Sequence, residues 1–349
     1  MINNECFTLE WINKVRDDNP PADPIIVEKT IYAFELLSKL SEKDFEFIFK
    51  GGTSLLLLIE NPKRLSIDID ISTNVSKEKI ESLLKDIIDE SRFNSWQENP
   101  RTNSNIPKKH YKLYFDSAIN KNYNSYILLD VLFQENPYPK TIQKEIKNKF
   151  IVADKVMKCI IPTADSILGD KLTAFAPNTT GIPFGVGKSM QIQKQLFDIG
   201  ELFNLAEDIK EIRESFTKFV EIESSYRNKI ISVNSVIEDI IGTSFLLSQI
   251  LLKKAVDNKD TKELQDGISK LRSHLIGINY NLEIAKTNAA RAAFIAVSLS
   301  QEKEFLGNRN FALDKISNTK LKAEYQILEK LKNPLPEAYY YWQKISEMT

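Results

Sequence analysis

Two aspartates, Asp68 and Asp70, are separated by one residue in a segment that alternates between apolar and polar side chains. Residues i and i+2 of a strand point to the same side, about 7 Å apart at ~3.4 Å rise per residue. Two carboxylates placed in this way offer oxygen ligands to a divalent cation, and Mg²⁺ prefers oxygen ligands that it shares with substrate phosphates. Asp-x-Asp taken alone more often marks an ordinary solvent-exposed strand face, so the neighbouring residues decide between the two interpretations.

A Gly-Gly-Thr sequence, Gly51 to Thr53, lies shortly upstream, between a predicted strand and a predicted short helix. The N-terminus of a helix presents free backbone N–H groups and a partial positive charge, and glycines let a phosphate approach the backbone. A Gly-Gly pair alone is usually a turn. A strand, a glycine-rich helix start and then an acidic strand face together indicate a site for a nucleoside triphosphate and a metal ion.

A third carboxylate, Asp130, lies in the otherwise apolar run Ile127–Phe133. An unpaired charge would be expensive to bury there, so we expect Asp130 to be paired, neutral or directed at a metal ion. The alternative is an aspartate at the end of a strand, facing solvent.

Lys171 lies within a predicted helix, Ala164–Ala176, that is otherwise largely apolar around it. Such a lysine either extends to solvent or faces an anion, and a triphosphate is an anion of this kind. Asp198 follows Lys194 by four residues in a second predicted helix, Gln191–Leu205. This spacing by itself favours an ion pair between Lys194 and Asp198 on the helix surface.

The periodicity of the chain predicts the elements that must position these residues. An α+β fold is expected, with a mixed β-sheet lobe and a helical N-terminal preface over residues 1–160, followed by a mainly α-helical lobe over residues 161–349 that completes the active site. The predicted strands are Phe45–Phe49, Ser66–Ser72, His110–Phe115 and Tyr126–Phe133, and the other predicted helices are Val27–Leu40, Ser54–Glu60 and a helix capped by Ser76.

The composition is that of a globular protein, with 42% hydrophobic and 27% charged residues. Acidic and basic residues nearly cancel, so no global charge attracts nucleic acid, and any positive surface for RNA must be local. No signal peptide and no apolar run of about 20 residues is present, so we expect a cytoplasmic protein without a membrane span. Neither His110 nor His274 has a partner at the sequence spacing of a metal site or a catalytic triad, and P-loop and dinucleotide fingerprints are missing.

Taken in order, these motifs resemble the AbiEii/AbiGii-type nucleotidyltransferase toxins of the DNA polymerase β-like superfamily. The resemblance spans roughly residues 45 to 205. It rests on Lys50-Gly-Gly-Thr-Ser-Leu, on Arg64-Leu-Ser-Ile-Asp-Ile-Asp70, on Asp170-Lys-Leu172 and on Lys194-Gln-Leu-Phe-Asp198.

The resemblance implies a role for each matching position. Gly51, Gly52 and Thr53 would contact nucleotide phosphates, with Arg64 and Ser66 beside them. Asp68 and Asp70 would bind one or two Mg²⁺ ions, and Asp130 is the candidate for the third carboxylate, as a metal ligand or base. Lys171 and Lys194 would meet the triphosphate, and Asp198 would take the acidic position of the last motif.

The implied reaction is attack by a substrate hydroxyl on the α-phosphate of an NTP, with release of pyrophosphate. The family suggests RNA acceptors, often the 3′ end of tRNA, and a cognate antitoxin encoded nearby, in a toxin–antitoxin or abortive-infection system. Asp130 or Asp198 would deprotonate the hydroxyl, and Lys171 would neutralise the departing pyrophosphate. Two alternatives are nucleotidyl transfer to a protein or small molecule, and a non-catalytic nucleotide-binding interaction protein.

Overall fold

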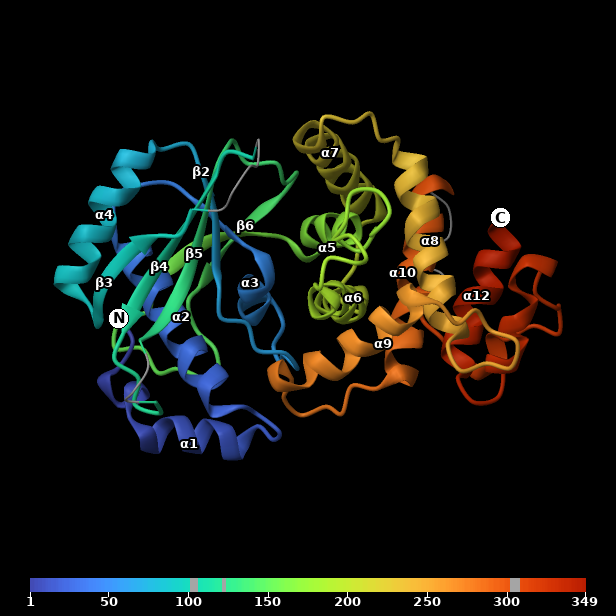
Figure 1. Ribbon diagram of the computed structural model, residues 1–349, viewed down its shortest axis with the longest axis horizontal. Helices are drawn as coiled ribbons and strands as arrows, with labels where there is room; N and C mark the ends of the chain where they lie inside the picture. The colour runs from blue at the N-terminus through green and yellow to red at the C-terminus, as the bar shows by residue number, and fades with distance from the viewer. Residues whose placement is uncertain (101–105, 121–123, 302–307) are drawn as a thin grey trace. The chain divides into compact units, whose positions relative to one another are not determined.

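The computed structural model describes residues 1–100, 106–120, 124–301 and 308–349. The chain divides into two compact units, each described by itself below. The first unit contains Met1–Thr163 and Ser273–Asn279, and the second contains Ala164–Arg272 and Tyr280–Thr349 (Figure 1). No helix among the described residues combines the length and the apolar character that crossing a membrane requires.

Within the described residues of the first unit, the strands form a seven-stranded mixed sheet in the order β3-β4-β5-β2-β1-β7-β6. The central strand β2 is antiparallel to β1 and parallel to β5, while β1 is parallel to β7. The strands are β1 (Ile48–Lys50), β2 (Ile69–Thr73), β3 (Phe93–Glu98), β4 (Lys108–Phe115), β5 (Ser125–Phe133), β6 (Thr141–Glu145) and β7 (Lys158–Pro162).

The helices of the first unit begin where the sequence supplies caps. The Asp23 side chain accepts from the backbone N–H of Ile25 at the start of α2, and the Ser76 side chain accepts from that of Lys79 at the start of α4. The elements are η1 (Asn4–Phe7), α1 (Leu9–Asp18), α2 (Pro24–Glu42), α3 (Gly51–Leu58) and α4 (Lys77–Glu90).

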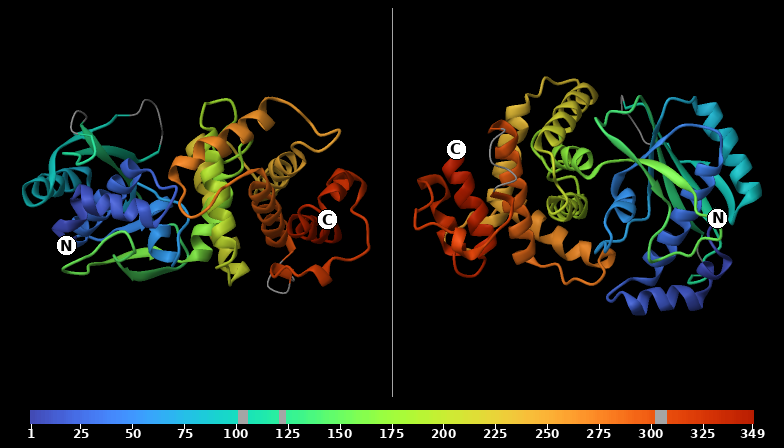
Figure 2. Two further views of the ribbon diagram at one scale, coloured as in Figure 1. Left: turned by 90° about the horizontal axis from the view of Figure 1, so that it is seen from below. Right: turned by 180° about the vertical axis from the view of Figure 1, so that it is seen from behind.

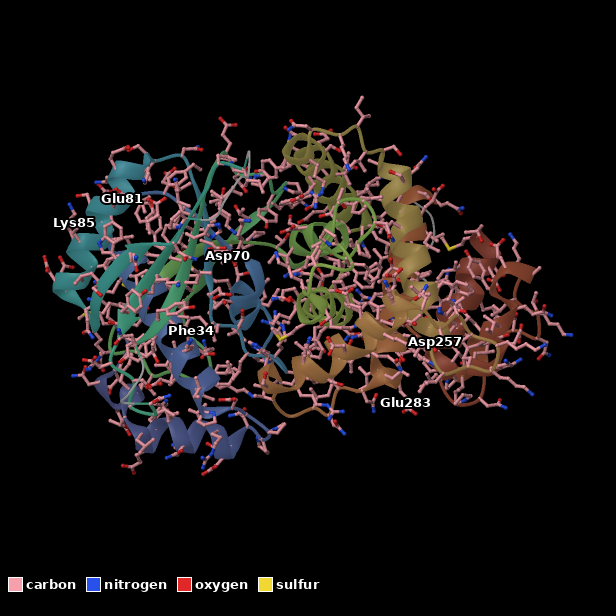
Figure 3. The ribbon with its side chains drawn as sticks, in the orientation of Figure 1. Phe34, Asp70, Glu81, Lys85, Asp257 and Glu283 are labelled. Carbon is pink, nitrogen blue, oxygen red and sulfur yellow. The ribbon has the colours of Figure 1, made fainter. Side chains whose placement is uncertain are left out.

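The two faces of the sheet differ in character because side chains alternate along each strand. One face carries Phe49, Ile71, Leu129 and Tyr111, all fully buried, and it packs on α2 and α4 in one hydrophobic core. Helix α2 lies against the sheet (Figure 2), and its residue Phe34, labelled in Figure 3, belongs to the same core. The opposite face carries the polar residues at the centre of the sheet, among them Asp70 and Asp130. Apolar and polar side chains that alternate along β2 thus point to opposite faces, with the core on one side and the candidate site on the other.

The second unit is built from helices. Helix α10 carries a run of fully buried alanines between Ala285 and Ala296, which allows neighbouring helices to approach closely, and it packs against α6, α8 and α12. The elements are α5 (Ala164–Ala174), α6 (Ser189–Phe203), α7 (Ile209–Arg227), α8 (Val233–Gln249), α9 (Lys259–Leu271), η2 (Arg272–His274, of which Ser273 and His274 belong to the first unit), α10 (Leu282–Gln301), η3 (Leu313–Lys315), η4 (Ala323–Leu331) and α12 (Pro336–Met348).

The predicted α+β class is confirmed, while several element boundaries differ from the prediction. The first strand begins at Ile48 rather than Phe45, and β2 begins at Ile69, so Ser66 and Asp68 precede the strand instead of lying within it. The physical reason for the second difference is tertiary, because the segment before β2 is bound by the side chain of Thr53. The glycines begin helix α3 directly, because Gly51 and Gly52 are its first two residues.

Candidate active site

Four polar residues form a row across the centre of the sheet. In register, Lys50 of β1 lies opposite Asp70 of β2, Asp70 lies beside Asp130 of β5, and Asp130 lies opposite His110 of β4. Register partners in neighbouring strands place their side chains on the same face of a sheet. The polar face therefore brings Asp70 and Asp130 together, as the sequence prediction required.

Lys108 and His110 complete the surroundings of Asp130. The Lys108 Nζ lies 2.5 Å from Asp130 Oδ2 and 3.6 Å from Asp70 Oδ1, and His110 Nδ1 lies 2.5 Å from Asp130 Oδ1. Burial acts to raise the pKa of Asp130, but the Lys108 charge and the hydrogen bonds of Lys108 and His110 outweigh it and hold that pKa below its ordinary value. Asp130 is thus a buried, ionised carboxylate.

Sequence reasoning missed these two residues. His110 appeared to have no partner at the spacing of a known motif, yet its partner Asp130 lies 20 residues away in the chain and directly opposite in the sheet. The available signal was the pattern Lys-x-His at the start of a predicted strand next to the strand of Asp130, which places both side chains on the acidic face.

We call Asp70 and Asp130, with Lys50 and His110 at either side, the acidic row. The start of α3 lies against Asp70 of this row (Figure 3). Gly51 has φ +78°, and a Cβ atom on it would lie 2.3 Å from Asp70 Oδ2, so glycine is required on both counts. A Cβ atom on Gly52 would lie 2.6 Å from the Arg64 Nη2 atom. The carboxylate of Asp70 consequently lies against the first residues of a helix, where backbone N–H groups have no partner within the helix.

Thr53 connects α3 to the segment that carries Asp68. Its buried side-chain oxygen donates to the carbonyl oxygen of Asp68 at 2.5 Å and lies 2.9 Å from Ser66 Oγ. Arg64 is also buried, and the neighbouring backbone N–H of Leu65 donates to the carbonyl oxygen of His274 at 2.7 Å. Thr53 therefore fixes the backbone that leads into β2, and its hydroxyl is engaged in that contact.

The carboxylate oxygens of Asp70 and Asp130 suit a hard divalent cation, because the two residues are register partners on neighbouring strands. The ammonium group of Lys108 already lies beside both carboxylates, which shows that positive charge is favoured there. Within the described residues, no cluster of three or more His, Cys, Asp or Glu side chains is arranged to hold a metal ion. Asp70 and Asp130 are thus brought together, while Asp68 is placed one residue before the strand.

The second unit holds the other predicted residues. The Lys171 Nζ of α5 lies 3.0 Å from Asp198 Oδ2 of α6, and both side chains are buried, with residue exposures of 7% and 2%. Lys194 lies one turn before Asp198 on α6 and is half-buried. The apolar neighbours of Lys171 thus keep it from solvent, and the anion that it faces in this structure is Asp198.

Comparison with known proteins gives a consistent result. A family model described as "Nucleotidyl transferase AbiEii toxin, Type IV TA system" matches residues 35–277, which is more than half of the chain. No curated protein matches the chain in sequence.

Among solved structures, the chain is similar to MenT4, a nucleotidyltransferase toxin from Mycobacterium tuberculosis, at 12% identity and a TM-score of 0.53, covering 96% of this chain and 98% of that one. It is also similar to JHP933 from Helicobacter pylori, at 16% identity and a TM-score of 0.45, covering 80% of this chain and 94% of that one. The first similarity supports the fold, and the family match carries the assignment. The chain therefore belongs to the AbiEii nucleotidyltransferase toxin family and is a nucleotidyltransferase toxin of a type IV toxin–antitoxin system.

Proposed function

We propose that this toxin transfers the nucleotidyl group of an NTP to an RNA acceptor, at the 3′ end of a tRNA, in a Mg²⁺-dependent reaction. The observation that carries this proposal is the register pairing of Asp70 and Asp130 against the start of α3. An acidic row beside a glycine-rich helix start provides for both parts of a metal–triphosphate complex. A tRNA acceptor would also place the reaction in the cytoplasm.

The first residues of α3 would bind the phosphates. Gly51 and Gly52 leave the backbone accessible, and the N–H groups of Gly51, Gly52 and Thr53 begin the helix. Because the hydroxyl of Thr53 is already bonded to the Asp68 carbonyl oxygen, its contribution would be the backbone N–H. Arg64 and Ser66, which lie next to Gly52, would hold this loop in place and add a positive charge near the phosphates.

Asp68, Asp70 and Asp130 would hold the divalent ion. When bound, Mg²⁺ supplies charge stabilisation to the attacking and leaving oxygens of the transfer. The ammonium group of Lys108 would balance the same two carboxylates, Asp70 and Asp130, in the absence of that ion.

The reaction forms a bond between the acceptor hydroxyl oxygen and the α-phosphorus, as the bond from that phosphorus to pyrophosphate breaks. The hydroxyl proton needs an acceptor, and of Asp130 and Asp198 we assign this role to Asp130. Asp130 shares the row with Asp70 and stays ionised because Lys108 and His110 stabilise its charge. The hydrogen bond from His110 would also keep the carboxylate oriented.

Lys171 and Lys194 would contact the triphosphate and neutralise the departing pyrophosphate. The contact between Lys171 and Asp198 at 3.0 Å supports a different role for Asp198 from the one that its position in the motif suggests. Asp198 would position Lys171 and balance its charge within an apolar setting, as a buried partner does.

The experiment is incubation of the purified protein with total bacterial RNA, Mg²⁺ and each α-³²P-labelled NTP in turn. The matched variants are Asp70→Asn, in the row, and Asp89→Asn, on the exposed face of α4. Label in a tRNA-sized band with the wild type and with Asp89→Asn, but not with Asp70→Asn, supports the proposal and identifies the nucleotide.

Other outcomes have distinct meanings. If the label enters a protein or a small molecule instead of RNA, that molecule is the acceptor and the proposed RNA acceptor is wrong. NTP binding without transfer to any acceptor favours a non-catalytic protein. As a toxin of a type IV system the protein has an antitoxin partner, and co-expression with the product of a neighbouring gene, followed by growth measurement, would identify that partner.

A further inference from the structure

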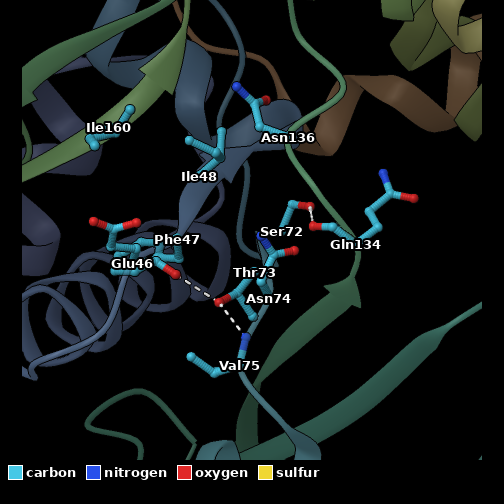
Figure 4. Close-up of a pocket in the computed structure, with 10 residues that line it drawn as sticks. All are labelled: Glu46, Phe47, Ile48, Ser72, Thr73, Asn74, Val75, Gln134, Asn136 and Ile160. Carbon is cyan, nitrogen blue, oxygen red and sulfur yellow. Dashed lines mark hydrogen bonds between the residues drawn. The ribbon is translucent and has the colours of Figure 1, made fainter.

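A pocket of about 430 Å³ lies on the polar face of the sheet in the first unit, beyond the acidic row. It is lined by the ends of three strands, and its lining includes Ile48, Ile160, Ser72 and Gln134 (Figure 4). Ser72 follows Asp70 by two residues on β2 and so projects from the same face, about 7 Å further along the strand. The pocket volume lies within the range of small-molecule sites.

The pocket and helix α3 lie at opposite ends of the β1–β2 ladder. The register places Lys50 opposite Asp70 and Ile48 opposite Ser72, and α3 begins directly after Lys50. Moving along β2 from Asp70 toward the pocket therefore leads away from the start of α3. Asp70 and Asp130 of the acidic row therefore lie between the pocket and the start of α3.

This order has a consequence for an in-line transfer. If the leaving pyrophosphate rests on the start of α3 and the α-phosphate lies at Asp70, the attacking oxygen must approach from the side opposite to α3. The pocket is on that side. We infer that the pocket lined by Ile48, Ser72, Gln134 and Ile160 binds the terminal nucleoside of the RNA acceptor and directs its hydroxyl toward Asp130.

The lining fits a nucleoside rather than a phosphate. Among the described residues that line the pocket there is no lysine, arginine or histidine, and Glu46 adds a negative charge. Ile48 and Ile160 are register partners and offer an apolar surface for a base, and Ile160 is 39% exposed. The lining includes the amides of Gln134 and Asn136, groups of the kind that recognise base edges and ribose hydroxyls. The Asn136 amide oxygen also accepts from the backbone N–H of Tyr138, and the Ser72 hydroxyl donates to the carbonyl oxygen of Gln134 at 3.1 Å, so Ser72 holds this part of the lining in place.

The inference rests on the proposed function, but it is tested first by a measurement that needs no turnover. A tRNA minihelix with 4-thiouridine as its last nucleotide is bound to the wild-type protein without NTP and irradiated, and the crosslinked peptides are mapped by mass spectrometry. We expect crosslinks in residues 72–75 or 134–136. Moving the 4-thiouridine five nucleotides inward should abolish them. Crosslinks confined to other segments overturn the inference.

Kinetics supplies the second test. Ile160→Trp fills the pocket from an exposed position, and Gln134→Ala removes an amide. Each should raise the KM for the RNA about tenfold and change the KM for the NTP by less than about twofold. The matched controls are Lys158→Trp, an exposed residue on the same strand, and Glu135→Ala, the exposed neighbour of Gln134, which is not part of the lining. Both controls should behave as the wild type.

The outcomes separate the two proposals. If the wild type labels RNA but the pocket variants leave the KM for RNA unchanged, or raise only the KM for the NTP, the inference is wrong and the proposed function stands. If the crosslink maps to the pocket and Ile160→Trp abolishes it while no transfer to RNA occurs, the pocket assignment stands and the proposed reaction fails.

Discussion

Asp70 and Asp130 occupy the same register position on two parallel neighbouring strands, and the ammonium group of Lys108 lies 3.6 Å and 2.5 Å from their respective carboxylates. Two carboxylates at one level of a sheet repel each other, so their proximity costs folding free energy unless a cation balances them. Lys108 provides that balance within the protein, and a divalent ion would provide it during the reaction.

Asp70→Asn should reduce nucleotidyl transfer about 100-fold to 1,000-fold, because it removes a charged ligand while keeping the side-chain shape. Thermal stability should be unchanged or slightly higher, because the repulsion with Asp130 disappears. The measurements are transfer rate and thermal unfolding, with Asp89→Asn as the control. A transfer rate equal to the wild type would remove Asp70 from the catalytic machinery.

Lys108→Met should strengthen metal binding, because the lysine and the ion compete for the same two carboxylates. We expect the Kd for Mn²⁺, measured by electron paramagnetic resonance without NTP, to fall about three- to tenfold. Lys109→Met is the matched control, since the adjacent side chain points to the other side of β4 and pairs with Glu98. Unchanged affinity in Lys108→Met would show that the ion does not bind between these carboxylates.

Gly51→Ala should destabilise the protein by about 1–3 kcal/mol and abolish NTP binding. The cause is the positive φ together with the contact that a Cβ would make with Asp70 Oδ2. Gly242→Ala is the control, because Gly242 is exposed on α8 and no atom lies within 4 Å of its added Cβ. That control should gain up to about 1 kcal/mol in the free energy of unfolding. Urea denaturation and NTP titration measure both quantities.

Lys171→Met or Asp198→Asn alone should cost about 3–5 kcal/mol of unfolding free energy, because each removes one member of a buried ion pair. The double variant should recover much of this loss. Transfer activity should not recover with it if Lys171 also meets the triphosphate. A double variant that regains full activity would limit both residues to a structural role.

Asp165 predicts a pH dependence of stability in the helical unit. Burial, aided by the charges of Glu211 and Asp208 and opposed by hydrogen bonds from the backbone N–H groups of Glu207 and Asp208, raises the pKa of Asp165 to about 6 from its ordinary 3.8. Between these two values the folded state binds more protons than the unfolded state, so the free energy of unfolding falls as the pH rises from 4 to 6.

Replacing this carboxyl with an amide should remove that trend. The raised pKa corresponds to a loss of at most about 3 kcal/mol, which is reached about one pH unit above the pKa of the folded state. Asp165→Asn should flatten the profile of unfolding free energy against pH over this interval, at the cost of one accepted hydrogen bond. Asp154→Asn, an exposed position, should leave the slope unchanged in chemical denaturation followed at several pH values.

The sequence determined the features that follow from local periodicity and from short motifs. Strict alternation indicated a strand with one polar face, which β2 forms from Ile69 onward, with Asp68 just before it. Ser76 marked the start of a helix, and Gly51 and Gly52 marked the start of another. Helical spacing around Lys171 indicated a lysine that either reaches solvent or faces an anion. These features depend on backbone geometry within a few residues, so a single sequence contains the information.

Only the tertiary structure decided which distant residues meet. Strand order and register bring His110 and Lys108 to Asp130. The packing of α5 on α6 pairs Asp198 with Lys171, whereas the sequence spacing had favoured an ion pair between Asp198 and Lys194. The pocket on the polar face of the sheet also arises from strand ends that are far apart in the chain. Pairing between strands depends on the total burial of the core, which no local pattern contains, and for that reason the partners of the acidic row were not predictable from the sequence.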